Sequence, residues 1–376
     1  MARVLLIGTA ETKGAELAAL SAALTGQGLL PDPIDISLMA GSVALSGAEK
    51  LALMAARGTE AGQEAAARAD GCLAALAIGG GTGGEIALDV LRALPDPLPK
   101  LLVTTLAFDP RAPLADCGIM LIPTLCDIEG VNPMLLGVFE RTAAMIAGLA
   151  GARVSSPATG PSVAVTTLGV TGAASAAILR ELSGRGGSAT VFHANGYGGA
   201  AFVRFVRAGQ ATGVIDLNLH ELGRMRLAGV SVPLTDRFTV AGSLPRIVLP
   251  GALNFLGLGA VDTLSPDHLC RPHYRHSGYF THVQLTEPEM ESQAIALADA
   301  LNAATGPTHV LLPMGGFSHE DRPGGAIEAP RLREIAADVL MSEARTYSVE
   351  HLSHHINAPD TAHAAVTSLF DRMPHD

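Results

Sequence analysis

Short apolar runs alternate with longer amphipathic stretches over the first half of the chain. The runs have the length of buried strands, and the stretches between them have helical spacing. Alternation of this kind is typical of βαβ units, in which helices cover a parallel sheet. It predicts strands at 3–8, 33–38, 72–79, 100–105 and 118–123, and helices at about 13–26, 48–69 and 131–149, with one more helix after the third strand.

The alternation pauses at GARVSSPATGPS, residues 151–162, a polar segment rich in glycine and proline that we interpret as a domain boundary. A second alternation follows. It predicts strands at 163–168, 189–194, 213–217, 246–251, 280–285, 308–313 and 346–351, and helices from 173 and at 200–208, 218–228, 287–304, 330–344 and 360–372. The predicted fold class is α/β, with two Rossmann-like subdomains at 1–155 and 160–376, mainly parallel sheets and an interdomain cleft.

Composition narrows the class of protein. The chain is 48% hydrophobic and carries a formal net charge of −11, with 25 lysines and arginines against 36 acidic residues. Nucleic acids and anionic membranes attract clustered cations, so we expect neither as a partner. No apolar run is long enough for a transmembrane helix, and the first residues resemble a strand rather than a signal peptide. Four cysteines without a CxxC pair are typical of a reducing compartment, and we expect a cytoplasmic protein.

Glycine-rich strand ends are candidate ligand sites, because parallel sheets bind ligands at the carboxyl ends of their strands. The first is IGTAETKGAE, where Thr9, Thr12 and Lys13 follow a strand and open a helix. Backbone N–H groups at a helix start suit an anion, and Lys13 is one of only three lysines in the chain. The alternative is an ordinary helix cap beside a solvated lysine.

Two further strand ends in the first lobe carry candidate groups. AIGGGTGGE allows a ligand to approach the backbone closely, although no acidic residue completes a dinucleotide fingerprint, and a turn for close packing is the alternative. IPTLCDIEGVNP places Asp127 where it either holds a metal that accompanies phosphates or caps the next helix. The candidate residues of the glycine-rich run are Gly79, Gly80, Gly81, Thr82, Gly83 and Gly84.

Titratable side chains concentrate in the second lobe, since all 13 histidines lie at or after His193. His193 ends a strand before the turn NGYGG, a position that suits general acid–base chemistry, although a lone histidine is more often structural. Asp216 and Glu221 flank another strand end, and the loop LPMGGFSHEDRPGG carries Ser318 and Asp321. The absence of a GxSxG motif disfavours a serine hydrolase triad in that loop.

The segment EHLSHHIN brings His351, His354 and His355 close together in the sequence. Two histidines four residues apart on a helix can bind zinc. The segment has no HExxH glutamate and is predicted as a strand end, so metal binding is the minority interpretation.

The ordered set of motifs resembles the family of the ATP-binding domain of the tomato mosaic virus resistance protein, which has many bacterial members. The matching stretches cover nearly the whole chain: IGTAETKGAEL, AIGGGTGGE, CDIEGVN, VTTLGVT, VFHANGYGGAA, GVIDLNLHEL, LPGALNF, LPMGGFSHEDRPG and HHIN. The resemblance implies two Rossmann-like subdomains, ATP bound mainly by the first, which we expect with Mg²⁺, and a homodimer or higher homo-oligomer.

Carried over by motif, the resemblance places Thr9, Thr12, Lys13 and the run 79–84 in the nucleotide site, and Asp127 at the third motif. The candidate catalytic residues at its C-terminal motif positions are His193, Asp216, Glu221, Ser318, Asp321 and His355. The second half departs from the family pattern, with NLHE in place of TTTE and SHED in place of SALD. The substrate therefore does not follow from the resemblance.

Together these features predict an enzyme that acts on a small metabolite at the interdomain cleft. Its phosphate-bearing ligand would lie on the first-lobe loops, and the second lobe would supply His, Asp and Glu groups. A nucleotide-independent hydrolase or lyase of a small carboxylated metabolite is the alternative. A ligand-binding regulator without turnover is the third hypothesis.

Overall fold

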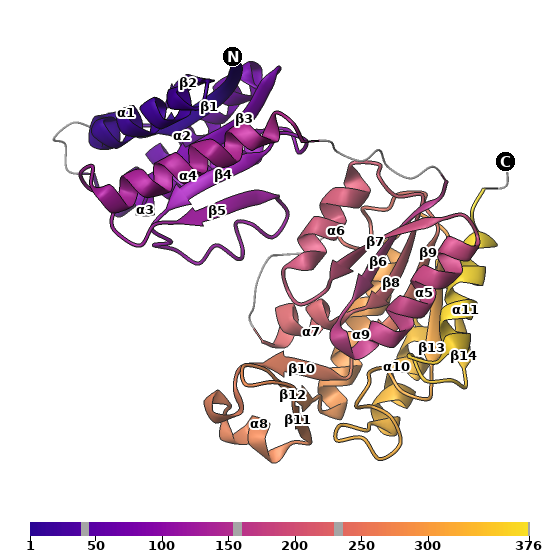
Figure 1. Cartoon of the computed structure of the whole chain (residues 1–376). Helices are drawn as coiled ribbons and strands as arrows, with labels where there is room; N and C mark the ends of the chain where they lie inside the picture. Colours follow the sequence, from indigo (N-terminus) through magenta and orange to yellow (C-terminus); the bar gives the residue numbers. More distant parts are fainter. Residues whose placement is uncertain (39–44, 153–159, 229–235, 375–376) are drawn as a thin grey trace. The chain divides into compact units, whose positions relative to one another are not determined.

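The computed structural model describes residues 1–38, 45–152, 160–228 and 236–374 (Figure 1). The chain divides into two compact units, Met1–Ser156 and Pro157–Asp376. Most of the predicted boundary segment, 153–159, lies outside the described residues. None of the helices in the described part of the chain is long and apolar enough to cross a membrane.

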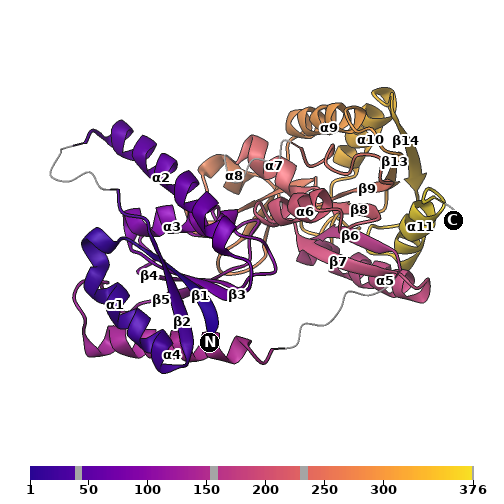
Figure 2. The ribbon, with the colours of Figure 1, turned by 90° about the horizontal axis from the view of Figure 1, so that it is seen from above.

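The first unit holds a five-stranded parallel sheet in the order β2-β1-β3-β4-β5. Its strands are β1 (Ala2–Gly8), β2 (Leu29–Asp35), β3 (Cys72–Ile78), β4 (Lys100–Thr104) and β5 (Ile119–Pro123). Its helices are α1 (Ala10–Gly26), α2 (Gly47–Arg68), α3 (Gly81–Ala93) and α4 (Pro133–Leu149). Helices α1 and α4 cover one face of the sheet, and α2 and α3 cover the other (Figure 2).

Alternation along the strands of this sheet explains the two layers. Leu5 and Ile7 of β1 pack with α2 and α3, whereas Val4 and Leu6 pack with α1 and α4. Strand β2 begins four residues before the predicted start and contains Pro31 and Pro33. Proline is tolerated there because β2 is an edge strand that pairs only with β1.

The second unit is built on a six-stranded parallel sheet in the order β14-β13-β9-β8-β6-β7. Its strands are β6 (Ser162–Thr167), β7 (Ser188–His193), β8 (Gly213–Asn218), β9 (Arg246–Gly251), β13 (Thr308–Pro313) and β14 (Tyr347–Leu352). Helices α5 (Gly172–Gly184) and α11 (Pro359–Phe370) cover one face. The other face carries α6 (Gly198–Arg207), α7 (His220–Leu227), α9 (Glu287–Asn302) and α10 (Pro330–Ser342) (Figures 1 and 2).

A small antiparallel sheet is inserted between β9 and β13, in the order β10-β12-β11. It contains β10 (Phe255–Leu258), β11 (His273–Arg275) and β12 (Thr281–Gln284), with the short helix α8 (Pro266–Cys270). The predicted strand at 280–285 corresponds to β12 of this small sheet. The prediction of two Rossmann-like subdomains with mainly parallel sheets is thus confirmed, whereas the interdomain cleft stays a prediction.

Candidate functional site

The strand order of the first unit places two predicted loops at the same edge of the sheet. The chain leaves β1 through α1 to the outer strand β2, and then crosses back through α2 to β3. Neighbouring strands β1 and β3 are therefore followed by helices on opposite faces, and ligands of open α/β sheets bind at such a point. Thr9 follows β1 and the run 79–84 follows β3, so both loops lie there.

The start of α1 is already occupied by groups of the chain itself. The Ala10 N–H donates to Asp35 Oδ1 at 2.9 Å, and the Glu11 N–H donates to Ser37 Oγ at 3.0 Å. Burial raises the pKa of Asp35, but hydrogen bonds from Ser37 and Ala10 outweigh burial and hold this pKa below its usual value. The Asp35 carboxylate thus takes the place that a bound anion would have at this helix start.

Lys13 and the two threonines of the first loop also have partners. The Lys13 ammonium lies 2.5 Å from Glu129 Oε2, and the Thr9 and Thr12 hydroxyls lie 2.8 Å apart. Lys13 has non-helical dihedral angles within α1, with φ −127° and ψ 29°. The first loop is therefore held together by internal contacts, including an ion pair on the lysine predicted to meet an anion.

The start of α3 lacks a side-chain cap. Its N-cap is Gly80, which offers no side-chain acceptor, whereas Ser46 caps α2 and Asn132 caps α4. The first N–H groups of a helix carry partial positive charge and need acceptors from outside the helix. Among the described helix starts of the first unit, only that of α3 has no side-chain acceptor for these N–H groups. The other three starts have one, from Asp35 at α1, Ser46 at α2 and Asn132 at α4.

The glycines of this loop differ in what surrounds the position that a Cβ would take. A Cβ on Gly79 would lie 2.5 Å from the backbone of Gly83 and Gly84, so Gly79 is required by packing. A Cβ on Gly83 would lie 3.5 Å from Thr9 Cγ2, which brings the β1 and β3 loops together. Gly81 faces open space and is exposed. The loop therefore presents bare backbone where α3 begins.

Asp127, the predicted metal ligand, is exposed and accepts a hydrogen bond from the Ile128 N–H at 2.7 Å. Asp127 does not cap the next helix either, because Asn132 caps α4 by accepting from the Leu135 N–H at 3.0 Å. Within the described ranges, no group of three or more His, Cys, Asp or Glu side chains is arranged to hold a metal ion.

In the second unit, the loops after β13 and β14 bring two predicted residues, Ser318 and His355, into contact. His355 Nε2 lies 3.0 Å from the carbonyl oxygen of Ser318, and the Asn357 N–H donates to His355 Nδ1 at 3.0 Å. This pattern assigns the His355 proton to Nε2. Burial lowers the pKa of His355, which keeps its ring neutral near pH 7.

The same loops do not form a serine hydrolase triad. The Asp321 carboxylate accepts from the N–H groups of Phe317 and Ala329 and pairs with Arg333, so it does not contact His355. The Ser318 hydroxyl is buried without a hydrogen-bond partner among the described residues, and His355 contacts its carbonyl oxygen instead. Burial raises the pKa of Asp321. These contacts hold the loop of Ser318 and Asp321 in place, and they do not activate the Ser318 hydroxyl as a nucleophile.

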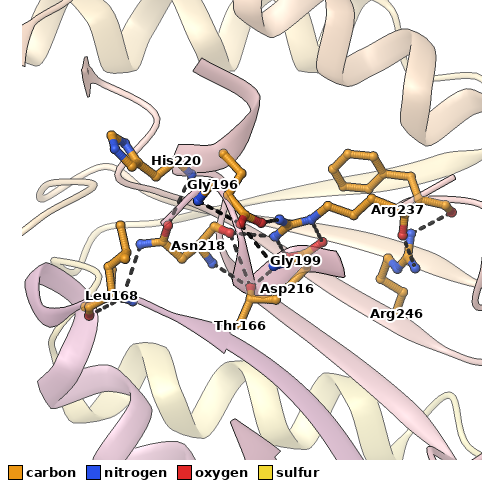
Figure 3. A network of polar contacts seen from close by, with 12 residues as sticks. Thr166, Leu168, Gly196, Gly199, Asp216, Asn218, His220, Arg237 and Arg246 are labelled. Carbon is orange, nitrogen blue, oxygen red and sulfur yellow. Dashed lines mark hydrogen bonds and ion pairs between the residues drawn. The ribbon is translucent and has the colours of Figure 1, made fainter. Parts of the chain in front are cut away.

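Asp216 and Glu221 form a fully buried ionic network with Arg237 (Figure 3). Arg237 Nη2 lies 2.5 Å from Asp216 Oδ1, and Arg237 Nη1 pairs with Glu221 Oε2. The Thr166 hydroxyl donates to Asp216 Oδ1 at 2.7 Å. All three charged side chains have no exposed surface, so neither carboxylate can touch a ligand that arrives from solvent. The two carboxylates therefore contribute to the buried interior of the second unit.

Glu221 also anchors the glycine turn that follows His193. Its Oε1 accepts the N–H groups of Gly196 at 2.8 Å and Gly199 at 3.0 Å. A Cβ on Gly198 would lie 2.1 Å from the His193 carbonyl oxygen, so the turn packs directly on that strand end. His193 itself is exposed. The network thus fixes the backbone beside an accessible imidazole.

Three histidines and Phe255 of the second unit form a chain of ring contacts that the motifs do not predict. The Phe255 ring lies 4.9 Å from His220 and 4.2 Å from His282, and His276 stacks on His282 at 4.7 Å between centroids. Burial lowers the pKa of His220 to about 4 and that of His282 to about 3. The signal missed in the sequence is the run of aromatic and histidine residues over 273–282, which begins in β11, a strand too short to be predicted, and ends in the predicted strand 280–285.

Comparison with known proteins identifies the family. Family models match residues 43–155, described as the N-terminal domain of uncharacterised protein family UPF0261, and residues 160–373, described as its C-terminal domain. The chain belongs to the UPF0261 family.

Relatives occur in bacteria and in a plant. A UPF0261 protein of Mesorhizobium japonicum is 32% identical over 98% of this chain and 99% of its own length. The ToMV resistance protein Tm-1(GCR237) of Solanum lycopersicum is 28% identical over 80% of this chain and 41% of its own length. A solved polyketide synthase ketoreductase matches with a TM-score of 0.26 and 15% identity, over 99% of this chain and 89% of that chain. The bacterial and the tomato relatives confirm the family resemblance that the motifs indicated.

Proposed function

We propose that the UPF0261 chain binds the phosphate groups of an ATP-like nucleotide at the start of α3, and that it uses this ligand as an enzyme of small-molecule metabolism. The observation that carries the proposal is the uncapped α3 start at the point between β1 and β3. A helix start of this kind offers several N–H donors and a favourable field to a phosphate. The capped starts of α2 and α4 do not.

The same proposal assigns different roles to the predicted first-lobe residues. The N–H groups of Gly81, Thr82 and Gly83 would meet the phosphates, and Thr9 would close the site from the β1 side. Lys13 would reach the phosphates only by leaving Glu129, whose side chain is 78% exposed and can be released. Because the described residues offer no three-ligand metal site, Mg²⁺ would enter bound to the phosphates, as it commonly does.

Replacing Gly81 with glutamate tests the phosphate site. An acid at the first position of α3 repels a phosphate but interacts favourably with the helix start, by about 0.3–1 kcal/mol, so the fold is retained. We expect ATP affinity in the presence of Mg²⁺ to fall by about tenfold or more, measured by isothermal titration calorimetry.

The matched control is Gly47→Glu, which places the same acid at the first position of α2. Gly47 also faces open space, and its helix start is capped by Ser46. This control should bind ATP as the unmodified chain does. If Gly81→Glu binds ATP with unchanged affinity, or if the unmodified chain binds no ATP at millimolar concentration, the proposed phosphate site is wrong.

For the second unit, we propose His193 as the acid–base group. Among the predicted catalytic side chains, Asp216, Glu221, Ser318 and Asp321 are fully buried, whereas His193 is exposed beside a fixed turn. The His193→Gln variant should therefore lose turnover by about 10²- to 10⁴-fold, followed as phosphate release from ATP with a metabolite mixture. The control His351→Gln changes an exposed histidine at another strand and should retain turnover. Full activity of His193→Gln would contradict the assignment.

A further inference from the structure

The small antiparallel sheet of the second unit packs over loops at the carboxyl edge of the large sheet. Its Phe255 packs with Ala252 from the loop between β9 and β10 and with Ile327 from the loop after β13. These two loops are also joined to each other, because the Ala252 N–H donates to the Phe317 carbonyl oxygen at 2.9 Å. Three segments therefore meet at the edge where parallel sheets bind ligands, beside α7 (Figure 1).

Each of these three segments carries a polar side chain that is buried without a hydrogen-bond partner among the described residues. The unpartnered atoms are both amide atoms of Asn254 in the β9–β10 loop, Nδ1 of His282 in β12, and the Ser318 hydroxyl in the loop after β13. Asn254 and Ser318 have no exposed surface, and His282 is 7% exposed. Such groups destabilise a fold and are rare in native proteins, where they bind ordered water or belong to a functional site.

The His282 ring is held by stacking on both faces. Phe255 stacks on it at 4.2 Å between centroids, and His276 stacks on it at 4.7 Å. Phe255 is buried and His276 is exposed, so the ring is approached from the His276 side. Burial, with repulsion from His276 and His220, lowers the pKa of His282 to about 3. The ring is therefore neutral near pH 7, and it binds a ligand as a hydrogen-bond donor or acceptor rather than as a cation.

The charged groups nearby already have partners within the chain. Glu320 Oε1 lies 2.7 Å from His319 Nδ1 and 3.2 Å from Arg322 Nη1. Side chains of the motifs accept N–H groups at the starts of α5, α6, α7 and α10, namely Asn357, Glu221, Asn218 and Asp321. An anion therefore finds these helix starts occupied and the charges of the β13 loop paired. A neutral ligand finds an amide, an imidazole and a hydroxyl.

We propose that Asn254, His282 and Ser318 bind a small neutral molecule with several hydroxyl groups, of the sugar or polyol class. The Asn254 amide and the Ser318 hydroxyl can both donate and accept, and the neutral imidazole of His282 does one of the two at Nδ1. Ligand hydroxyl groups also donate and accept, so they match this set of side chains. The site belongs to the second unit alone and does not depend on nucleotide binding by the first unit.

Binding is tested on the full chain without nucleotide, by NMR of protein that carries ¹⁵N-labelled histidine. The probes are D-ribose, D-glucose and myo-inositol at millimolar concentration, with D-glucuronate as the charged counterpart of D-glucose. At least one neutral probe should shift the ring-nitrogen resonances of His282, which the His282→Gln variant assigns. The resonances of the exposed His351 should not move, and D-glucuronate should cause no shift. A shift with none of the probes, or with D-glucuronate alone, would overturn the proposal.

Two variants remove hydrogen-bonding groups with little change of side-chain shape, Asn254→Leu and Ser318→Ala. Each should weaken binding of the probe by about tenfold or more, because each removes a hydrogen bond made in a buried place. Urea denaturation without the probe should show both variants to be as stable as the unmodified chain or more stable, since the lost groups have no partner among the described residues. The control Ser342→Ala, at an exposed position of α10, should leave probe binding unchanged.

The same variants can contradict the assignment in two ways. Probe binding that neither variant weakens would place the ligand elsewhere. The second way is a strong loss of stability in both variants without the probe, as expected of Asn218→Leu, whose buried amide donates to Thr171 Oγ1 and accepts from the His220 N–H. The groups would then be satisfied by ordered water in the free chain, and the proposal would be wrong.

Discussion

Replacing Arg237 with methionine should lower the free energy of unfolding by about 3–5 kcal/mol, because it leaves two buried carboxylates without the arginine that forms ion pairs with them. Arg237, Asp216 and Glu221 are all fully buried, and Arg237 also donates to the Asn218 carbonyl oxygen at 2.8 Å. Burial lowers the pKa of Arg237, but the two carboxylates outweigh it and raise this pKa, so the guanidinium stays charged. Urea denaturation at pH 7.5 measures the loss.

Two comparisons separate the cost of leaving charges buried without a partner from the cost of losing an arginine ion pair of any kind. Arg207 pairs with Asp236 on the surface, with 62% and 40% of the two side chains exposed, so Arg207→Met should cost less than about 1 kcal/mol. Adding Asp216→Asn and Glu221→Gln to Arg237→Met removes the unpaired charges and should recover part of the lost stability. An Arg237→Met variant as stable as Arg207→Met would show that the buried network contributes little.

The order of the elements could be predicted from the sequence because alternation fixes it locally. Strands such as β3 and helices such as α2 lie within a few residues of their predicted bounds. Strand β2 begins earlier than predicted because the tolerance for Pro31 and Pro33 depends on the edge position of the strand. The short strands β10 and β11 were not predicted, because segments of three or four residues carry almost no periodic signal.

The candidate site was only partly predictable, since motifs name residues but not their partners. The sequence indicated the glycine run at 79–84 and the acids Asp216 and Glu221. It gave no sign that Asp35 fills the start of α1, or that Arg237, from a segment without any motif, forms ion pairs with both acids. Contacts between groups far apart in the chain decide which candidate side chains remain available to a ligand. In the first unit they favour α3 over α1, and in the second they favour His193 over the acids.

Acid should destabilise the protein steeply below pH 6.5, because His220 and His282 are buried as neutral rings. Their pKa values are lowered to about 4 and about 3, chiefly by burial, with further repulsion from Arg224 on His220 and from His276 on His282. Unfolded histidine has a pKa near 6.5. Between about pH 6.5 and these lowered values, the unfolded chain binds protons that the folded chain does not, so stability falls as pH falls.

Each of the two rings should account for about 2 kcal/mol of stability lost between pH 7.5 and pH 5. The His282→Gln variant cannot take up that proton in either state. Between pH 7.5 and pH 5, the free energy of unfolding of this variant, measured by urea denaturation, should therefore fall by about 2 kcal/mol less than that of the unmodified chain. This difference does not depend on the stability of the variant at pH 7.5. The exposed His351, replaced by glutamine, should leave the pH dependence unchanged. A His282→Gln curve parallel to that of the unmodified chain would mean that the ring is protonated in the folded protein as readily as in the unfolded one. That outcome would contradict the burial of His282, which is 7% exposed between Phe255 and His276.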